Sequence, residues 1–163
     1  MNAAISFDKE AVLNILAKHR SLPGAMLPIL HAIQDRVGFI PSEVVPLIAE
    51  ELNLSRAEVH GVVTYYHFFR QYPAGKQVVQ ICRAEACQSN GGNDLAKHAQ
   101  KKLACDFHET TKDGQFTLEP VYCLGQCGCA PAMMVGDDIY GRVTPEKFDR
   151  VLERSLVEKR GEK

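Results

Sequence analysis

QVVQICRAEAC, residues 77–87, marks the point where the chain changes from a helical to a strand-containing pattern. QVVQIC is a short apolar run rich in β-branched residues, which predicts a β-strand that ends at Cys82. FTLEPVYCLGQC, residues 116–127, predicts a second strand that ends near Cys123. Each predicted strand therefore leads into a loop that carries two cysteines.

The two cysteine pairs have the spacing C-x4-C for Cys82 and Cys87 and C-x3-C for Cys123 and Cys127. A [2Fe–2S] cluster takes four thiolates, two on each iron, and two such loops can supply them. A structural zinc ion also takes four cysteines, although its pairs are usually C-x2-C. The spacing thus favours a [2Fe–2S] cluster and leaves a zinc-stabilised structural module as an alternative.

Other chemistry is less consistent with the sequence. A thioredoxin-type redox pair needs C-x-x-C, which is absent. A Rieske centre needs two histidine ligands, and no histidine neighbours either cysteine loop at suitable spacing. Cys105 closes a predicted helix and is expected to be a partly buried structural thiol. Cys129 follows the second pair closely, but four ligands are already present without it. No histidine is predicted as a ligand, although His67 stands out because it follows an aromatic cluster, and such a cluster is more often part of a core than of a site.

The remaining pattern after residue 76 predicts a small α/β sandwich. NDLAKHAQKKLAC (93–105) is an amphipathic helix, AMMVGDDIYGRV (132–143) is a hairpin, and PEKFDRVLERSLVEK (145–159) is a closing helix with Thr144 as its N-cap. The predicted order of elements is therefore β-α-β-β-α.

Residues 1–72 are predicted to form a small helical bundle or arm. Apolar residues recur at helical spacing in SFDKEAVLNILAKHR (6–20), AMLPILHAIQDRVG (25–38) and EVVPLIAEEL (43–52). A fourth helix begins at the Ser55–Glu58 capping box, ahead of VHGVVTYYHFF (59–69). QYPAGK (71–76) is the linker, so we predict an α+β chain with a helical region, 1–72, and an α/β domain, 76–163.

Composition excludes several classes of function. The chain has 163 residues and a net charge of −1, which gives no reason to expect nucleic acid or an anionic membrane as a partner. No apolar run approaches the roughly 18 residues of a membrane span, and MNAAISFDKEA lacks the apolar core of a signal peptide. We therefore expect a cytoplasmic protein with reduced cysteines. It has no P-loop or Gly-rich dinucleotide fingerprint with which to bind NAD or flavin itself.

The motif C-x4-C…C-L-G-x-C-G resembles that of the thioredoxin-like [2Fe–2S] ferredoxin family. This family includes the small iron–sulfur subunit of the NADH-oxidising module of respiratory complex I. The resemblance implies a thioredoxin-like domain after a helical region, and one [2Fe–2S] cluster in place of zinc. It also implies the ligands Cys82, Cys87, Cys123 and Cys127.

One departure from the complex I pattern narrows the resemblance further. Those members usually have small residues and Thr between the first two cysteines, whereas this chain has CRAEACQS (82–89). That run and LPGAMLPILHAIQDRVGFIP (22–41) are similar to the gamma subunit of cytosolic NAD-dependent, molybdenum-containing formate dehydrogenases. The implied role is a non-catalytic electron-transfer subunit, with a flavin- and NAD-binding subunit and a molybdenum-containing catalytic subunit as partners. Complex I and an NAD-reducing hydrogenase are the alternatives.

Overall fold

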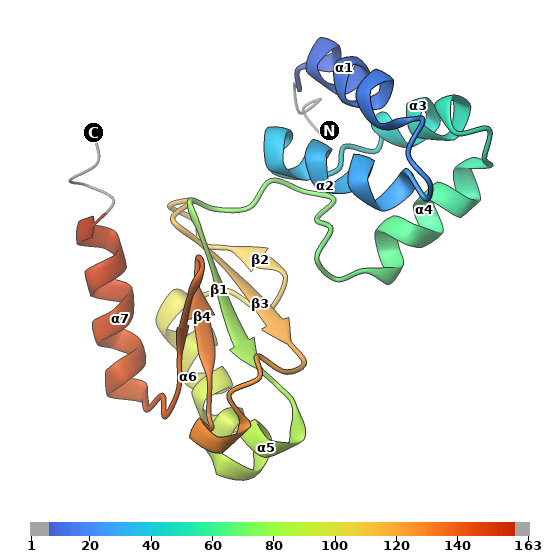
Figure 1. Ribbon diagram of the computed structural model, residues 1–163. Helices are drawn as coiled ribbons and strands as arrows, with labels where there is room; N and C mark the ends of the chain where they lie inside the picture. Colours follow the sequence, from blue (N-terminus) through green and yellow to red (C-terminus); the bar gives the residue numbers. More distant parts are fainter. Residues whose placement is uncertain (1–6, 159–163) are drawn as a thin grey trace. The chain divides into compact units, whose positions relative to one another are not determined.

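The computed structural model describes residues 7–158, and the chain divides into two compact units, Met1–Pro73 and Ala74–Lys163 (Figure 1). The first unit is helical, and the second combines a mixed sheet with helices. This architecture confirms the predicted α+β class. Among residues 7–158, no helix has the length and apolar character that crossing a membrane requires.

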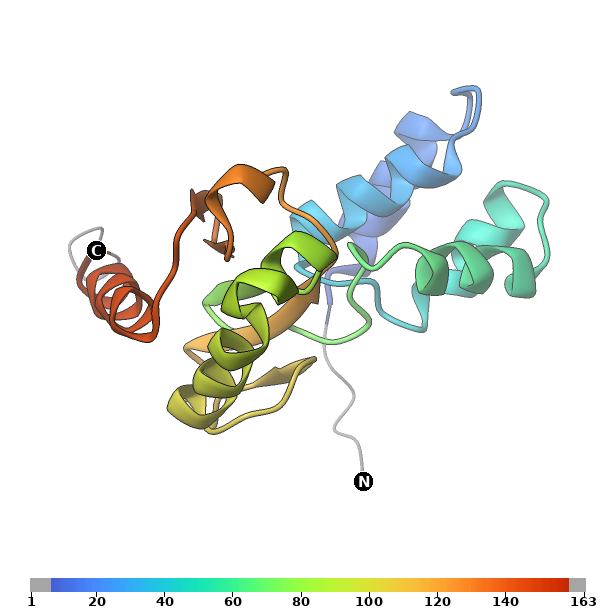
Figure 2. The ribbon, with the colours of Figure 1, turned by 90° about the horizontal axis from the view of Figure 1, so that it is seen from below.

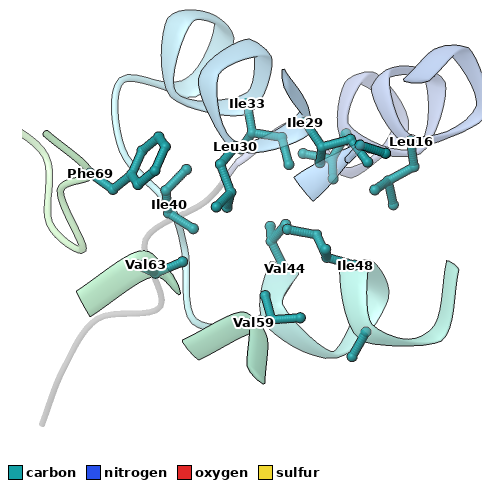
Figure 3. Close-up of a cluster of buried hydrophobic side chains, with 13 residues drawn as sticks. Leu16, Ile29, Leu30, Ile33, Ile40, Val44, Ile48, Val59, Val63 and Phe69 are labelled. Atoms are coloured by element: carbon teal, nitrogen blue, oxygen red, sulfur yellow. The ribbon is translucent and has the colours of Figure 1, made fainter. Parts of the chain in front are cut away.

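Four helices make up the first unit: α1 (Lys9–His19), α2 (Met26–Val37), α3 (Val44–Glu51) and α4 (Arg56–Tyr65). The sequence predicted all four, the last of them from its capping box, and each turns an apolar face toward a common core (Figure 3). The buried side chains of this core include Val12, Leu16, Ile29, Leu30, Ile33, Ile40, Val44, Ile48, Val59, Val63 and Phe69.

Local hydrogen bonds fix the ends of these helices. The Asp8 carboxylate accepts from the Ala11 N–H at 3.0 Å and caps α1. Gly38 ends α2 with a φ of 92°, a left-handed conformation that glycine adopts without steric cost. Ser55 and Glu58 form both halves of the predicted capping box at the start of α4.

Helix α4 ends at Tyr65, before the rest of the aromatic run that follows it in the sequence. The buried side chain of Gln34 in α2 donates to the Phe68 carbonyl at 2.8 Å and accepts from the Arg70 N–H at 2.7 Å. The Arg70 carbonyl in turn accepts from the Ile40 N–H at 2.7 Å. These bonds replace helical ones, so the segment after Tyr66 is held against α2 in a non-helical conformation.

The second unit is built on a five-stranded sheet with the order β2-β3-β1-β4-β5. The strands are β1 (Gln77–Cys82), β2 (Glu109–Thr110), β3 (Phe116–Val121), β4 (Met133–Val135) and β5 (Asp138–Tyr140). Strands β1 and β3 are parallel, and the other neighbours are antiparallel. The sequence predicted all of them except β2, a short and exposed edge strand.

Two helices, α6 (Asn93–Leu103) and α7 (Pro145–Glu158), pack against this sheet and against each other. Leu95 and Ala99 from α6 join Phe148 from α7 in a core with the sheet residues Ile81 and Leu118. The predicted N-cap of α7 is present, because the Thr144 hydroxyl accepts from the Lys147 N–H at 3.2 Å. In Figures 1 and 2 the short helix α5 (Glu85–Cys87) leads directly toward α6.

Candidate metal centre

Parallel pairing of β1 and β3 brings the two cysteine loops to one edge of the sheet. Cys82 is the last residue of β1 and lies opposite Val121, the last residue of β3. Directly after this pair, the Arg83 N–H donates to the Val121 carbonyl at 2.7 Å. Because parallel strands end at the same edge, the loop that starts at Cys82 and the loop that contains Cys123 start side by side.

The first loop folds back tightly around Cys87. Cys87 ends α5, and the kinked segment η1 (Gln88–Gly92) connects it to α6. Gly92 lies so close that a Cβ atom there would be 2.6 Å from the Cys87 carbonyl oxygen, so glycine is required. The Gln88 side chain closes the loop by donating to the Arg83 carbonyl at 2.7 Å.

The second loop holds its cysteines with unusual backbone geometry. Cys123 has a φ of 110°, which is rare for a residue with a side chain, and Gly125 has a φ of 75°. The Gly125 N–H points at the Cys123 sulfur, 3.3 Å away. The Cys123 and Cys127 sulfurs are 3.7 Å apart, and Cys127 begins the 3₁₀ turn η2 (Cys127–Cys129). Such strained positions cluster at functional sites.

The sulfur of Cys82 connects the two loops. Burial raises the pKa of the Cys82 thiol, but hydrogen bonds outweigh this effect and leave the pKa below its ordinary value. The Ala84 N–H and the Cys87 thiol provide two of these bonds, and the second-loop backbone at Leu124 and Cys123 provides others. Groups from both loops therefore stabilise negative charge on the Cys82 sulfur.

The other sulfurs resist losing their protons at the same time. Burial raises the pKa of Cys87 to about 11, and the hydrogen bond and charge of Cys82 and the charge of Cys127 add to this. The hydrogen bond with Cys123 and its charge raise the pKa of Cys127, with a further contribution from Cys82. These thiols would repel one another as anions across both loops, and a cationic centre between the two pairs would allow them to ionise together.

The grouping of these sulfurs fits a two-iron cluster. Within residues 7–158, no three or more His, Cys, Asp or Glu side chains surround one position suited to a single metal ion. The cysteines instead form the local pairs Cys82 with Cys87 and Cys123 with Cys127. Two thiolates on each of two irons is the arrangement that a [2Fe–2S] cluster uses.

The two remaining cysteines lie outside these pairs. Cys105 packs against the core of the second unit, and burial raises the pKa of its thiol. Cys129 ends η2, and its carbonyl accepts from the Arg142 N–H. Gly141 lies against it, since a Cβ atom there would be 2.7 Å from the Cys129 Cβ. His67, which follows the aromatic cluster in the sequence, is exposed.

Comparison with known proteins identifies the family. A family model described as thioredoxin-like [2Fe-2S] ferredoxin matches residues 12–156. The chain belongs to the thioredoxin-like [2Fe-2S] ferredoxin family. Its fold is therefore thioredoxin-like with N-terminal helices, and its cofactor is one [2Fe–2S] cluster, as the sequence predicted.

Relatives within the family are components of larger enzymes. The chain is 35% identical over 135 residues to the NADP-reducing hydrogenase subunit HndA of Solidesulfovibrio fructosivorans, covering 81% of this chain and 79% of the relative. It is 36% identical over 129 residues to an NADH-quinone oxidoreductase subunit of Pseudomonas aeruginosa, covering 79% of this chain and 78% of the relative.

A solved structure has the same fold. The crystal structure of an NAD+-reducing [NiFe]-hydrogenase in the air-oxidized state superimposes with a TM-score of 0.68 at 20% identity. The match covers 86% of this chain but only 24% of that longer chain. At this identity the likeness extends to the fold alone.

Proposed function

We propose that this chain is a non-catalytic electron-transfer subunit of an NAD- or NADP-linked oxidoreductase complex. The observation that carries the proposal is the meeting of two cysteine loops at one sheet edge, in a member of a [2Fe–2S] family. When bound, the cluster supplies one-electron transfer. Its proposed ligands are Cys82, Cys87, Cys123 and Cys127.

The loops around these cysteines are suited to such a role. Cys82 and Cys87 are buried, whereas Cys123 and Cys127 are exposed, so the second loop is the edge across which an electron would enter or leave. The Gly125 N–H donates to the Cys123 sulfur, and such bonds stabilise negative charge on sulfur and raise a cluster's potential. The chain would thus shield the cluster from solvent at the first loop and leave it accessible to an electron donor or acceptor at the second.

The identity of the parent complex is better supported as complex I or a hydrogenase than as formate dehydrogenase. The two relatives above come from a hydrogenase and from an NADH-quinone oxidoreductase. The formate dehydrogenase hypothesis, with its molybdenum-containing partner, rests on CRAEACQS (82–89) and residues 22–41 alone. Purifying the native complex and identifying its large subunits by mass spectrometry decides between these assignments.

We further propose the division into a helical region, 1–72, and a cluster domain, 76–163, with the helical region as the element that binds a flavin- and NAD-binding subunit. Tyr65, Tyr66 and Phe68 are 74%, 43% and 52% exposed, an unusual amount of aromatic surface for a small helical unit. A cytoplasmic location is also proposed, because a reducing compartment keeps free cysteines from forming disulfides before they bind a metal.

The metal content tests the cluster directly. Protein purified without oxygen should contain about two irons and two acid-labile sulfides per chain, and the reduced form should give an S = 1/2 EPR signal. Stoichiometric zinc without iron would instead support the structural-module alternative and overturn the electron-transfer proposal.

A further inference from the structure

Arg83 occupies a position that the cluster ligands alone do not explain. It follows Cys82 directly and is the first residue of the run in which this chain departs from the complex I pattern. Its N–H donates to Val121 before the second loop, and its carbonyl accepts from Gln88 after Cys87. The backbone of Arg83 therefore ties the two loops together and holds the residue in place.

The side chain of Arg83 is a half-buried cation without a counter-charge. Its Nε atom is buried with no hydrogen-bond partner, and one terminal nitrogen donates to the Asn93 side-chain oxygen at 3.3 Å. The guanidinium carbon lies over the Phe107 ring, 5.4 Å from its centroid. In the part of the chain that the structure describes, no carboxylate forms an ion pair with it.

An aromatic ring and a neutral amide hold this charge in place without cancelling it. Burying an unpaired cation costs free energy, so a negative group nearby is the expected compensation. A [2Fe–2S] cluster with four thiolates carries such a charge, and reduction adds one more electron to it. Arg83 directly follows Cys82, and consecutive Cα atoms are about 3.8 Å apart, so the chain itself keeps the guanidinium within on the order of 10 Å of the Cys82 sulfur.

We infer that Arg83 sets the reduction potential of the cluster, raising it by stabilising the reduced form electrostatically. The inference rests on the proposed ligand set. Arg83 is a positioning and tuning residue, because it acts on the cluster through its charge and binds no iron. We take the guanidinium and the added electron as unit charges about 10 Å apart at an effective dielectric constant near 20. Their attraction then changes the reduced-to-oxidised ratio roughly tenfold, which corresponds to a shift of about 59 mV in the one-electron reduction potential.

Three variants of the full-length chain test this inference by EPR-monitored redox titration. Arg83→Gln removes the charge and should lower the reduced-to-oxidised ratio at a fixed potential about tenfold. Arg83→Lys keeps the charge but loses the planar contact with Phe107, and should retain most of the wild-type ratio. Arg142→Gln is the matched control, because Arg142 is exposed beside Cys129 and its charge is screened by water, so the change should stay below about twofold.

A fourth variant leaves the arginine itself unchanged. Asn93→Asp places a carboxylate where the guanidinium already donates, at the start of α6 where an acidic residue is favourable. It should offset the charge of Arg83 and lower the ratio in the same direction as Arg83→Gln, and an unchanged ratio would overturn the inference even if Arg83→Gln loses its cluster.

The outcomes separate this inference from the proposed function. Three results would overturn the role of the Arg83 charge. The first is an unchanged ratio in Asn93→Asp, and the second is an equal fall of the ratio in Arg83→Gln and Arg83→Lys. The third is a fall in Arg142→Gln as large as that in Arg83→Gln. Each of those results requires a cluster that is present, so the ligand proposal would survive. Wild-type protein without iron would overturn the proposed function itself.

Discussion

Cys82 and Cys87 are 2% and 3% exposed, whereas Cys123 and Cys127 are open to solvent. The buried pair packs with Ala132, and the partly buried residues Ala84, Val121, Leu124 and Ala130 lie against them. The backbone of the second loop helps to position the exposed pair, since the Gly125 N–H donates to the Cys123 sulfur. The four proposed ligands are thus all thiols, but only the first two are shielded from solvent.

Alanine replacements of the proposed ligands test the set one residue at a time. Each change at Cys82, Cys87, Cys123 or Cys127 removes one of four thiolates and should abolish or destabilise the cluster, as measured by iron and labile sulfide per chain. Cys105→Ala is the control: it should keep the cluster and cost on the order of 1 kcal/mol through a small cavity.

Cys129 provides a second control for the same set, since it lies only two residues beyond Cys127. Cys129→Ser should keep full iron content, although its potential can shift with the changed surroundings. Loss of iron in Cys129→Ser together with retention in Cys127→Ser would show that the fourth ligand has been assigned to the wrong residue.

The cysteines could be predicted from their spacing, but the geometry that presents them could not. Cys123 has a positive φ, and only glycine or asparagine at a position gives a sequence signal for that conformation. Gly92 does carry a signal, because adjacent glycines before a helix indicate close backbone approach. Gln34 also carries one: it follows Leu30 at helical spacing and therefore lies on the buried face of α2.

At the scale of helices and strands, sequence patterns predicted every long element. The end of α4 could not be predicted from them, because hydrogen bonds to a distant residue determine it. The aromatic run 65–69 has no helix breaker, yet Gln34, more than 30 residues earlier, holds it out of the helix. Strand β2 was missed for a related reason, because two exposed polar residues carry no alternation and pair only through β3.

The capping box of α4 gives an element-scale prediction. The backbone and hydroxyl of Ser55 donate to the Glu58 carboxylate and lower its pKa from the ordinary value of 4.5. Ser55→Ala also removes the acceptor for the Glu58 N–H, and should destabilise α4 by about 1 kcal/mol. Hydrogen exchange of the α4 amides measures the loss at pH 7.

The pH dependence of this cap follows from the direction of the shift. A lowered pKa means that the carboxylate contributes stability above pH 4.5 and loses it as the pH falls through the lower, folded-state value. In Ser55→Ala the pKa of Glu58, followed by NMR, should rise toward 4.5. Ser42→Ala is the matched control, because Ser42 donates to the adjacent Glu43 and caps no helix. Equal loss of α4 protection in both variants would contradict this account.

Across the whole molecule, two separate cores account for the two compact units. The core of the helical unit draws only on residues 12–69, and the core of the second unit draws on residues 79–152. All six cysteines lie in the second unit, and this change in composition along the sequence is why the boundary between the units could be predicted. All four proposed ligands therefore belong to the second unit.

Removal of residues 1–73 separates cluster binding from assembly. The remaining chain keeps Ile81, Leu118 and Phe148 in its core and both cysteine loops, so it should fold and retain about two irons and two sulfides. It should fail to co-purify with the flavin- and NAD-binding partner, because the exposed aromatic residues of the helical region are gone. The matched control is full-length Cys123→Ser, which should lose the cluster but still join the complex in high salt, since apolar contacts are not screened. Normal assembly of the truncated chain would show that the helical region is not the docking element.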